Sequence, residues 1–156
     1  YGNEFTVATV GTIKVTPHSV NVIPGTCTFS LEIRDQSAEV MKLIENHLRQ
    51  LLEDICKKYG VTSTFVPTSY HDPAPMSELV RGTIEEAVKE LGIDYTVIPS
   101  GAFHDSLIMT SVFPTGMIFV PSKDGISHSR YEYTAPEDIE NGCNVLLNTV
   151  LKLDEK

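Results

Sequence analysis

The fold is decided by residues 27–58, which read CTFSLEIRDQSAEVMKLIENHLRQLLEDICKK. In residues 27–34, apolar and polar side chains alternate with a period of two, which is typical of a half-buried β-strand. Residues 35–37 then supply helix-capping side chains, and the apolar positions that follow recur at helical spacing and form one stripe. Gly60 is placed to end the helix. The stretch therefore predicts a strand that leads directly into a long amphipathic helix over residues 37–58.

The residues on either side of this stretch extend the pattern. Residues 6–15 alternate in the same way, and the turn dipeptide Pro24-Gly25 separates them from the next strand, so two antiparallel strands are expected. After the helix, residues 61–67 again read as a strand. About the first seventy residues therefore predict the order β-β-α-β, an α+β arrangement of a sheet covered by one helix.

A breaker-rich segment, HDPAP at residues 71–75, marks the predicted domain junction, with one domain over residues 1–71 and another over residues 72–156. Beyond it, helical and strand-like segments alternate, as expected for part of an α/β domain. Helices are predicted over residues 77–91, 104–111 and 136–151, and short strands over residues 95–98 and 116–120. The predicted class of the whole chain is α/β.

Composition narrows the function. The chain has 156 residues, 41% hydrophobic and 21% charged, with a net charge of -9, and an acidic surface of this kind repels nucleic acid. No apolar run approaches the roughly 20 residues that cross a bilayer, so no membrane partner is expected. Cys27, Cys56 and Cys143 show no paired or zinc-finger spacing, which predicts buried or half-buried free thiols in a reducing cytoplasm.

Two loops at predicted strand ends carry the chemistry. His104 follows the first of these strands and His128 follows the second, 24 residues later. Loops at the ends of strands are where α/β proteins place functional groups, and histidine is the usual acid–base group and metal ligand. A single loop histidine is nevertheless more often solvated than functional, so residue type alone leaves both readings open.

The motifs around these histidines resemble a known family. Residues 100–105, SGAFHD, resemble the family motif Ser-Gly-Ala-Gly-His-Asp, and residues 125–129, GISHS, resemble its Gly-Ile-Ser-His segment. Residues 21–25, NVIPG, with Arg34 closing the next strand, are similar to the hairpin of its lid domain. The family is that of the zinc-dependent amidohydrolases of the N-carbamoyl-L-amino-acid hydrolase, allantoate amidohydrolase and β-ureidopropionase type, in the aminoacylase-like metallopeptidase superfamily. The match covers about residues 9–151.

This resemblance implies roles for the two histidines. His128 looks like the ligand that closes a site for two divalent metal ions, zinc or else manganese, nickel or cobalt, and imidazole suits these metals. Glu132 is a candidate hydrogen-bond partner for the His128 ring, the alternative being a plain surface carboxylate. His104 looks like the catalytic group that hydrogen-bonds the scissile carbonyl or its tetrahedral oxyanion.

The resemblance also implies the substrate contacts. The backbone at Gly101 and Phe103 would face the substrate. Phe103 stands where the family has glycine, and because its ring adds bulk, the substrate side chain that this chain prefers stays open. Asn21 and Arg34 look like lid-domain groups that grip a substrate carboxylate, since a guanidinium offers a planar fork of donors. Without the family, Arg34 would be read as solvated and Asn21 as a turn residue.

The function implied is hydrolysis of the carbamoyl C–N bond of an N-carbamoyl-amino acid or allantoate-like substrate, by a cytoplasmic homodimer paired through its lids. The family's other metal ligands and its catalytic glutamate lie N-terminal to anything in this sequence, so a fragment that is inactive and binds no metal tightly is expected. Two other hypotheses remain: a folding and dimerising module, and a carboxylate-binding module without turnover.

Overall fold

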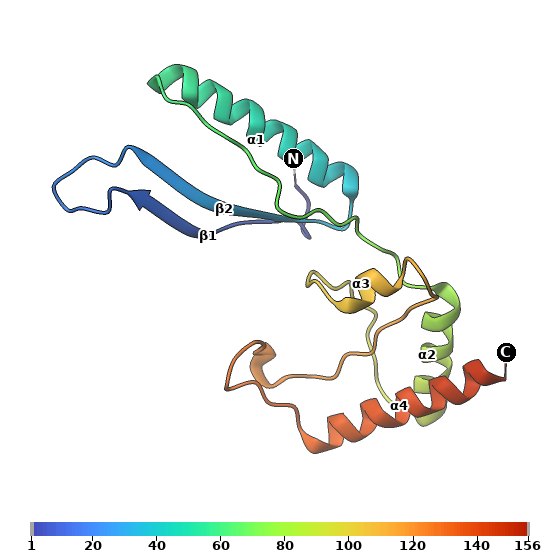
Figure 1. Cartoon of the computed structure of the whole chain (residues 1–156). Coiled ribbons are helices and arrows are strands. Elements are labelled where there is room, and N and C mark those ends of the chain that lie inside the picture. Colours follow the sequence, from blue (N-terminus) through green and yellow to red (C-terminus); the bar gives the residue numbers. More distant parts are fainter. Residues whose placement is uncertain (1, 156) are drawn as a thin grey trace. The chain divides into compact units, whose positions relative to one another are not determined.

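The computed structural model describes residues 2–155 and contains two compact units, Tyr1–Pro73 and Ala74–Lys156. The first holds the strands β1 (Val7–Thr16) and β2 (Thr26–Arg34) and the helix α1 (Ala38–Tyr59). The second holds α2 (Glu78–Leu91), α3 (Asp105–Met109), the short 3₁₀ turn η1 (Lys123–Gly125) and α4 (Pro136–Asp154), as Figure 1 shows. The chain is thus of the predicted α/β class. The units are divided between Pro73 and Ala74, whereas the sequence placed the junction between residues 71 and 72.

The hairpin of β1 and β2 is antiparallel, with Val7 opposite Arg34 at one end and Thr16 opposite Thr26 at the other. The register shifts between Val10 and Ile13, where the hydroxyl of Ser30 accepts hydrogen bonds from the backbone N–H and the hydroxyl of Thr12, both at 3.0 Å. The side chain therefore satisfies a donor that a bulge removes from the ladder. Both predicted strands are confirmed to within one residue at each end.

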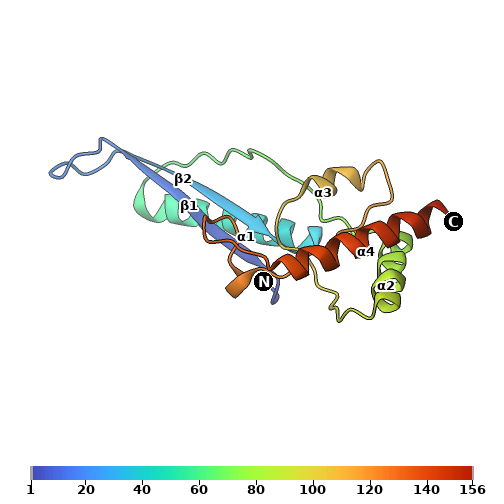
Figure 2. The ribbon, with the colours of Figure 1, turned by 90° about the horizontal axis from the view of Figure 1, so that it is seen from below.

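Helix α1 forms where its end signals predict it. The Ser37 hydroxyl accepts from the backbone N–H of Val40, and Gly60 ends the helix in the left-handed conformation at φ 65°. The chain then turns back along α1, as both views of the ribbon show (Figures 1 and 2). The Arg49 guanidinium lies 3.7 Å from the centre of the Phe65 ring, a cation–π contact that holds the returning segment on the helix.

Three predicted strands are wrong. Residues 61–67, 95–98 and 116–120 are extended but carry no strand assignment, and the one sheet within residues 2–155 is the two-stranded β1–β2 pair. A strand exists only through hydrogen bonds to a neighbour, and local sequence sets extension but not the neighbour. The predicted order β-β-α-β is therefore β-β-α followed by an extended return.

The second unit is built on the crossing of α2 and α4. Its buried apolar side chains are Ala87 and Val88 on α2 and Val145 on α4. Residues 116–120 pack closely here, because a Cβ added to Gly116 would lie 2.7 Å from Cγ1 of Val80, and one added to Gly142 of α4 would lie 2.5 Å from Cγ1 of Val120. Glycine lets the extended segment lie directly against both helices.

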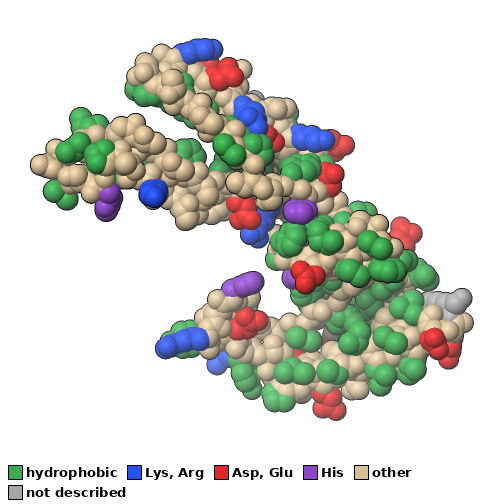
Figure 3. Space-filling view, in the orientation of Figure 1, with side chains coloured by type: hydrophobic (Ala, Val, Ile, Leu, Met, Phe, Trp, Pro, Cys, Tyr) green, Lys and Arg blue, Asp and Glu red, His purple; other side chains and the backbone are tan. Residues whose placement is uncertain are grey.

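Large apolar side chains are exposed over much of the second unit, as the space-filling view shows (Figure 3). On α4, five large apolar side chains are each more than 45% exposed: Ile139, Leu146, Leu147, Val150 and Leu151. Contiguous apolar surface of this kind marks faces that are covered in the functional state. No helix within residues 2–155 is both long and apolar enough to span a bilayer.

The prediction that all three thiols are at least half-buried is wrong for two of them. Cys27 and Cys143 are exposed, Cys56 is half-buried, and all three are free. Cys27 lies on the hairpin, where little covers either face, and Cys143 lies on α4. The usual burial of free cysteine predicted these positions to be inward, but a face is buried only where a second element packs on it.

Candidate functional site

His104 lies at the turn between an extended segment and α3, where it is the residue that precedes the helix, with φ -130° and ψ 155°. Its carbonyl accepts from the backbone N–H of Leu107 at 2.9 Å, which begins the helix. The side chain is half-buried, and two groups hold the ring. Nε2 lies 3.0 Å from Oγ of Ser100, and the ring of Phe119 packs against it edge to face at 5.6 Å between centroids. His104 is thus held in one orientation by neighbours on two segments.

The loop before His104 is open on its outer side. The Ser100 hydroxyl accepts from the backbone N–H of Ala102 at 3.3 Å, which shapes the turn. A Cβ added to Gly101 would meet no atom within 4 Å, and the Phe103 side chain is exposed. The backbone at Gly101 and Phe103, predicted to face a substrate, is therefore accessible beside the His104 ring.

His128 lies in a self-supporting loop. The loop is closed at its base by the backbone N–H of Lys123, which donates to the carbonyl of Tyr133 at 2.8 Å. His128 itself has φ 54°, in the left-handed region that a non-glycine residue rarely adopts. Its ring is exposed. Backbone strain of this kind persists only where neighbouring contacts enforce it.

Glu132 supplies that contact. Its Oε2 accepts a hydrogen bond of 2.8 Å from the backbone N–H of His128, while its own N–H donates to the carbonyl of Ser129 at 3.0 Å. Glu132 was left open between a partner of the His128 ring and a plain surface carboxylate, and in this structure the carboxylate binds the main chain of His128. A carboxylate is a strong acceptor, and a turn of this curvature presents a main-chain donor to it.

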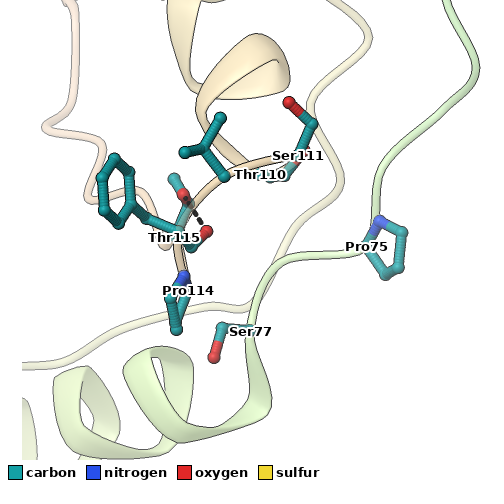
Figure 4. A pocket seen from close by; sticks show the side chains of 8 residues that line it. Pro75, Ser77, Thr110, Ser111, Pro114 and Thr115 are labelled. Carbon is teal, nitrogen blue, oxygen red and sulfur yellow. Dashed lines mark hydrogen bonds between the residues drawn. The ribbon is translucent and has the colours of Figure 1, made fainter.

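Two concavities lie in the second unit. One, of about 360 Å³, is lined by the turn after α3 and the start of α2, and Figure 4 shows its residues, including Ser77, Thr110 and Thr115. No acidic, basic or thiol side chain lines it, so it offers little chemistry. The other, of about 520 Å³, is lined by Lys123, Asp124, Ile126, Tyr131 and Tyr133, in the same loop as His128.

Asn21 and Arg34 belong to the first unit and lie at opposite ends of its hairpin. Asn21 is exposed in the loop that joins the strands, and its Oδ1 accepts from the Ser19 hydroxyl at 2.8 Å. Arg34 is the last residue of β2, and its Nη2 lies 2.9 Å from Oε1 of Glu32. A strand of nine residues spans roughly 26 Å at about 3.3 Å per step. The two side chains therefore do not come together on one carboxylate within one chain.

A metal centre needs several ligands in one place. Within residues 2–155, no group of three or more His, Cys, Asp or Glu side chains could hold a metal ion. Three or four such ligands are the usual minimum for a zinc site. The described residues thus do not fit a complete metal centre, and His128 is the one predicted ligand among them.

Sequence reasoning missed the two groups that hold the catalytic candidate. Ser100 stood in the quoted motif without a role, and Phe119 was read as one apolar residue of a strand. A serine four positions before a loop histidine is a local signal that could have been used. No local signal marks Phe119, because its contact with His104 joins segments 15 residues apart.

Comparison with known proteins gives consistent results. The model of peptidase family M20/M25/M40 matches residues 3–152. An N-carbamoyl-L-amino acid amidohydrolase of Geobacillus stearothermophilus is 40% identical over 95% of this chain, and an allantoate amidohydrolase of Bacillus subtilis is 34% identical over 93% of it. The crystal structure of AtUAH in complex with (S)-hydroxyglycine superposes with a TM-score of 0.91 at 34% identity over 99% of this chain. The chain spans 36%, 35% and 37% of these three proteins.

Proposed function

The chain belongs to peptidase family M20/M25/M40, and on that premise we propose that it is part of a metal-dependent amidohydrolase that cleaves the ureido C–N bond of an N-carbamoyl-L-amino acid or an allantoate-like compound. The observation that carries the proposal is the held ring of His104, which lies beside the open backbone of Gly101 within the family motif. The names of the two bacterial relatives supply the substrate class.

In this proposal His104 is the catalytic residue that donates a hydrogen bond to the substrate carbonyl. The bond strengthens as negative charge develops on that oxygen in the tetrahedral intermediate, because a fixed donor needs no reorganisation at that moment. The ring is half-buried, so water competes less with the ligand for the donor than it would at a fully exposed site. The exposed backbone at Gly101 and Phe103 would position the rest of the ureido group.

His128 is proposed as one ligand of a site for two divalent ions, zinc or manganese, nickel or cobalt. Such ions, when bound, activate water and polarise a carbonyl. The remaining ligands would come from residues outside this chain, because its described residues assemble no group of three or more donors. The His128 ring is exposed, and its loop is closed by its own hydrogen bonds rather than by α2 or α4. Both features support a role as a ligand to a metal ion that other residues also bind.

The substrate carboxylate is proposed to bind Arg34, whose guanidinium already holds the Glu32 carboxylate. An exposed ion pair of this kind is weak, so a ligand carboxylate can replace Glu32 at small cost. Asn21 would act at a separate position, since it lies at the other end of the hairpin. The first unit is proposed to be a lid and dimerisation domain, and the unpaired outer edges of β1 and β2 in the described sheet suit pairing with a second copy.

A segment exchange tests the proposal. The 148 residues of this chain that match the Geobacillus relative would replace their counterparts in that protein, and turnover of an N-carbamoyl-L-amino acid would be measured after loading with zinc, manganese, nickel or cobalt. We expect the hybrid to be active. His104→Ala should lower its kcat by a factor of about 10²–10³. His128→Ala is expected to lose bound metal together with activity.

His18→Ala is the matched control, because His18 is an exposed histidine of the hairpin loop. A folded, metal-loaded hybrid without turnover would contradict the proposal. So would a hybrid in which His104→Ala and His18→Ala turn over equally fast. The unassisted chain is proposed to be inactive and cytoplasmic, and its three free thiols suit a reducing compartment.

The second candidate is a non-catalytic module that dimerises or binds carboxylates. Binding of an N-carbamoyl-L-amino acid that is lost in Arg34→Ala, with no turnover even in the hybrid, would select it. Size-exclusion chromatography with light scattering measures whether the chain is a dimer.

A further inference from the structure

The hydrogen bonding of Ser100 determines which nitrogen of His104 carries a proton. A hydroxyl has one hydrogen to donate and two lone pairs to accept with, and a neutral imidazole has one donor and one acceptor. The backbone N–H of Ala102 already donates to Oγ of Ser100 at 3.3 Å. Nε2 of His104 lies 3.0 Å from the same oxygen. Either the hydroxyl donates to Nε2, or an Nε2–H donates to the hydroxyl.

The first arrangement leaves one group without a protein partner, Nδ1–H, whereas the second leaves two, the Ser100 hydrogen and the Nδ1 lone pair. If Nε2–H donated, Oγ would accept two hydrogen bonds, and its own hydrogen would have no acceptor among residues 2–155, where the Ser100 side chain hydrogen-bonds only to Ala102 and His104. If the hydroxyl donates, its hydrogen and the acceptor nitrogen are both used. Accepting from Ala102 also polarises the O–H and strengthens its donation. Ser100 is half-buried, which makes an unsatisfied hydroxyl costly.

From this geometry we infer that Ser100 is a positioning residue that donates to Nε2 of His104 and holds the ring as the Nδ1–H tautomer, so that Nδ1–H is the donor offered to a ligand carbonyl. Within residues 2–155, the ring makes one hydrogen bond, at Nε2 to Ser100, and one aromatic contact, with Phe119, so Nδ1 has no protein acceptor. The ring of Phe119, inclined at 61° to the imidazole, limits its rotation about the Ser100 hydrogen bond. A neutral imidazole donates without carrying charge into the site.

The tautomer itself is independent of turnover, but its use toward a carbonyl rests on the proposed function. A carboxylate in place of Ser100 could only accept a hydrogen bond, and it would therefore favour Nε2–H or the charged imidazolium. The serine hydroxyl is matched to a neutral histidine, because it can donate to Nε2 and still accept from the turn. The motif residue therefore has a chemical task distinct from shaping the loop.

Nitrogen NMR of the whole chain tests the inference. With ¹⁵N-labelled histidine at about pH 8.5, well above the ordinary histidine pKa of about 6.5, long-range ¹H–¹⁵N spectra distinguish a protonated ring nitrogen from an unprotonated one. We expect His104 to show a protonated Nδ1 and an unprotonated Nε2. His18, exposed and without a side-chain contact in the described structure, provides the solvent tautomer mixture in the same spectrum.

Ser100→Ala is expected to move His104 to the mixture shown by His18, and Ser100→Thr to restore the Nδ1–H form. Ser111→Ala is the matched control, because that hydroxyl donates to the carbonyl of Ile108 in the same unit. A protonated Nε2 in the unsubstituted chain would overturn the inference whether or not Ser100→Ala folds. An unchanged spectrum in a folded Ser100→Ala would also overturn it. An inactive hybrid enzyme would refute the proposed function and leave the tautomer result standing.

Discussion

Oε2 of Glu132 accepts the backbone N–H of His128 at 2.8 Å, and His128 is the one histidine with a positive φ. The left-handed conformation costs a non-glycine residue about 1–2 kcal/mol, so the contact stabilises a backbone that would otherwise relax. The Glu132 carboxylate thus fixes the backbone conformation from which the His128 side chain projects, without a hydrogen bond to the ring.

Glu132→Ala should loosen this loop. We expect the His128 amide to exchange about fivefold faster, as loss of a hydrogen bond worth about 1 kcal/mol implies. Glu132→Gln should retain most of the protection, because its amide oxygen still accepts. Glu140→Ala serves as the control, because it removes a carboxylate from α4 that makes no hydrogen bond or ion pair within residues 2–155. Equal exchange in all three variants would show that the loop holds itself without Glu132.

Two helix glycines should respond oppositely to alanine. Gly142→Ala should destabilise the second unit by about 1–3 kcal/mol, because its Cβ would lie 2.5 Å from Cγ1 of Val120. Gly82→Ala should stabilise it by about 0.5–1 kcal/mol, because no atom lies within 4 Å and alanine favours helix. Thermal unfolding measures both. A Gly142→Ala protein as stable as Gly82→Ala would mean that residues 116–120 do not lie against α4.

Asp35 gives the first unit a pH dependence. The Thr6 hydroxyl donates to Oδ2, and together with the backbone N–H of Ser37 it lowers the pKa of Asp35 below its ordinary value of 3.8, against a smaller opposing effect of burial. A carboxyl group whose pKa is lower when folded stabilises the fold above pH 3.8, and this contribution is lost as pH falls through the lowered value.

Thr6→Val should raise the pKa of Asp35 toward 3.8 and weaken this acid dependence. Carboxyl ¹³C titration by NMR follows the group directly. Thr9→Val, at an exposed position of β1 just after Thr6, should leave the titration unchanged. A lower pKa in Thr6→Val than in the unsubstituted protein would refute the assignment of Thr6 as the main cause.

Asn21 and Arg34 should act independently on a ligand. Because they lie at opposite ends of the hairpin, the effects of Asn21→Ala and Arg34→Ala on binding of an N-carbamoyl-L-amino acid should add to within about 0.3–0.5 kcal/mol. Calorimetry on the single and double variants gives the coupling. A coupling above about 1 kcal/mol would mean that one carboxylate reaches both, which a single hairpin does not permit.

Zinc should bind this chain weakly. With His128 as the one predicted ligand, titration calorimetry should show no tight two-site binding, since stable zinc sites use three or four ligands. His128→Ala should remove the residual binding, and His18→Ala should not. Two tight sites would contradict this prediction, because they would require metal ligands to come together that lie apart among the described residues.

The sequence predicted the local structure well where the signals are local. Ser37 and Gly60 bound α1 because each satisfies backbone groups within its own turn. The motifs around His104 and His128 identified the family, which the match over residues 3–152 confirms. The helix caps and the two motifs are both local features, which can be recognised from residues adjacent in the sequence.

Only the tertiary structure decided which extended segments become strands, which thiols and apolar faces are covered, and which predicted groups meet. Residues 95–98 and 116–120 were predicted as strands but form none, because a ladder needs a partner that the local pattern does not specify. The contact of Phe119 with His104 and the distance between Asn21 and Arg34 were likewise not specified by the local pattern. Periodicity sets the conformation of a segment, whereas its neighbours are chosen by packing across the whole chain.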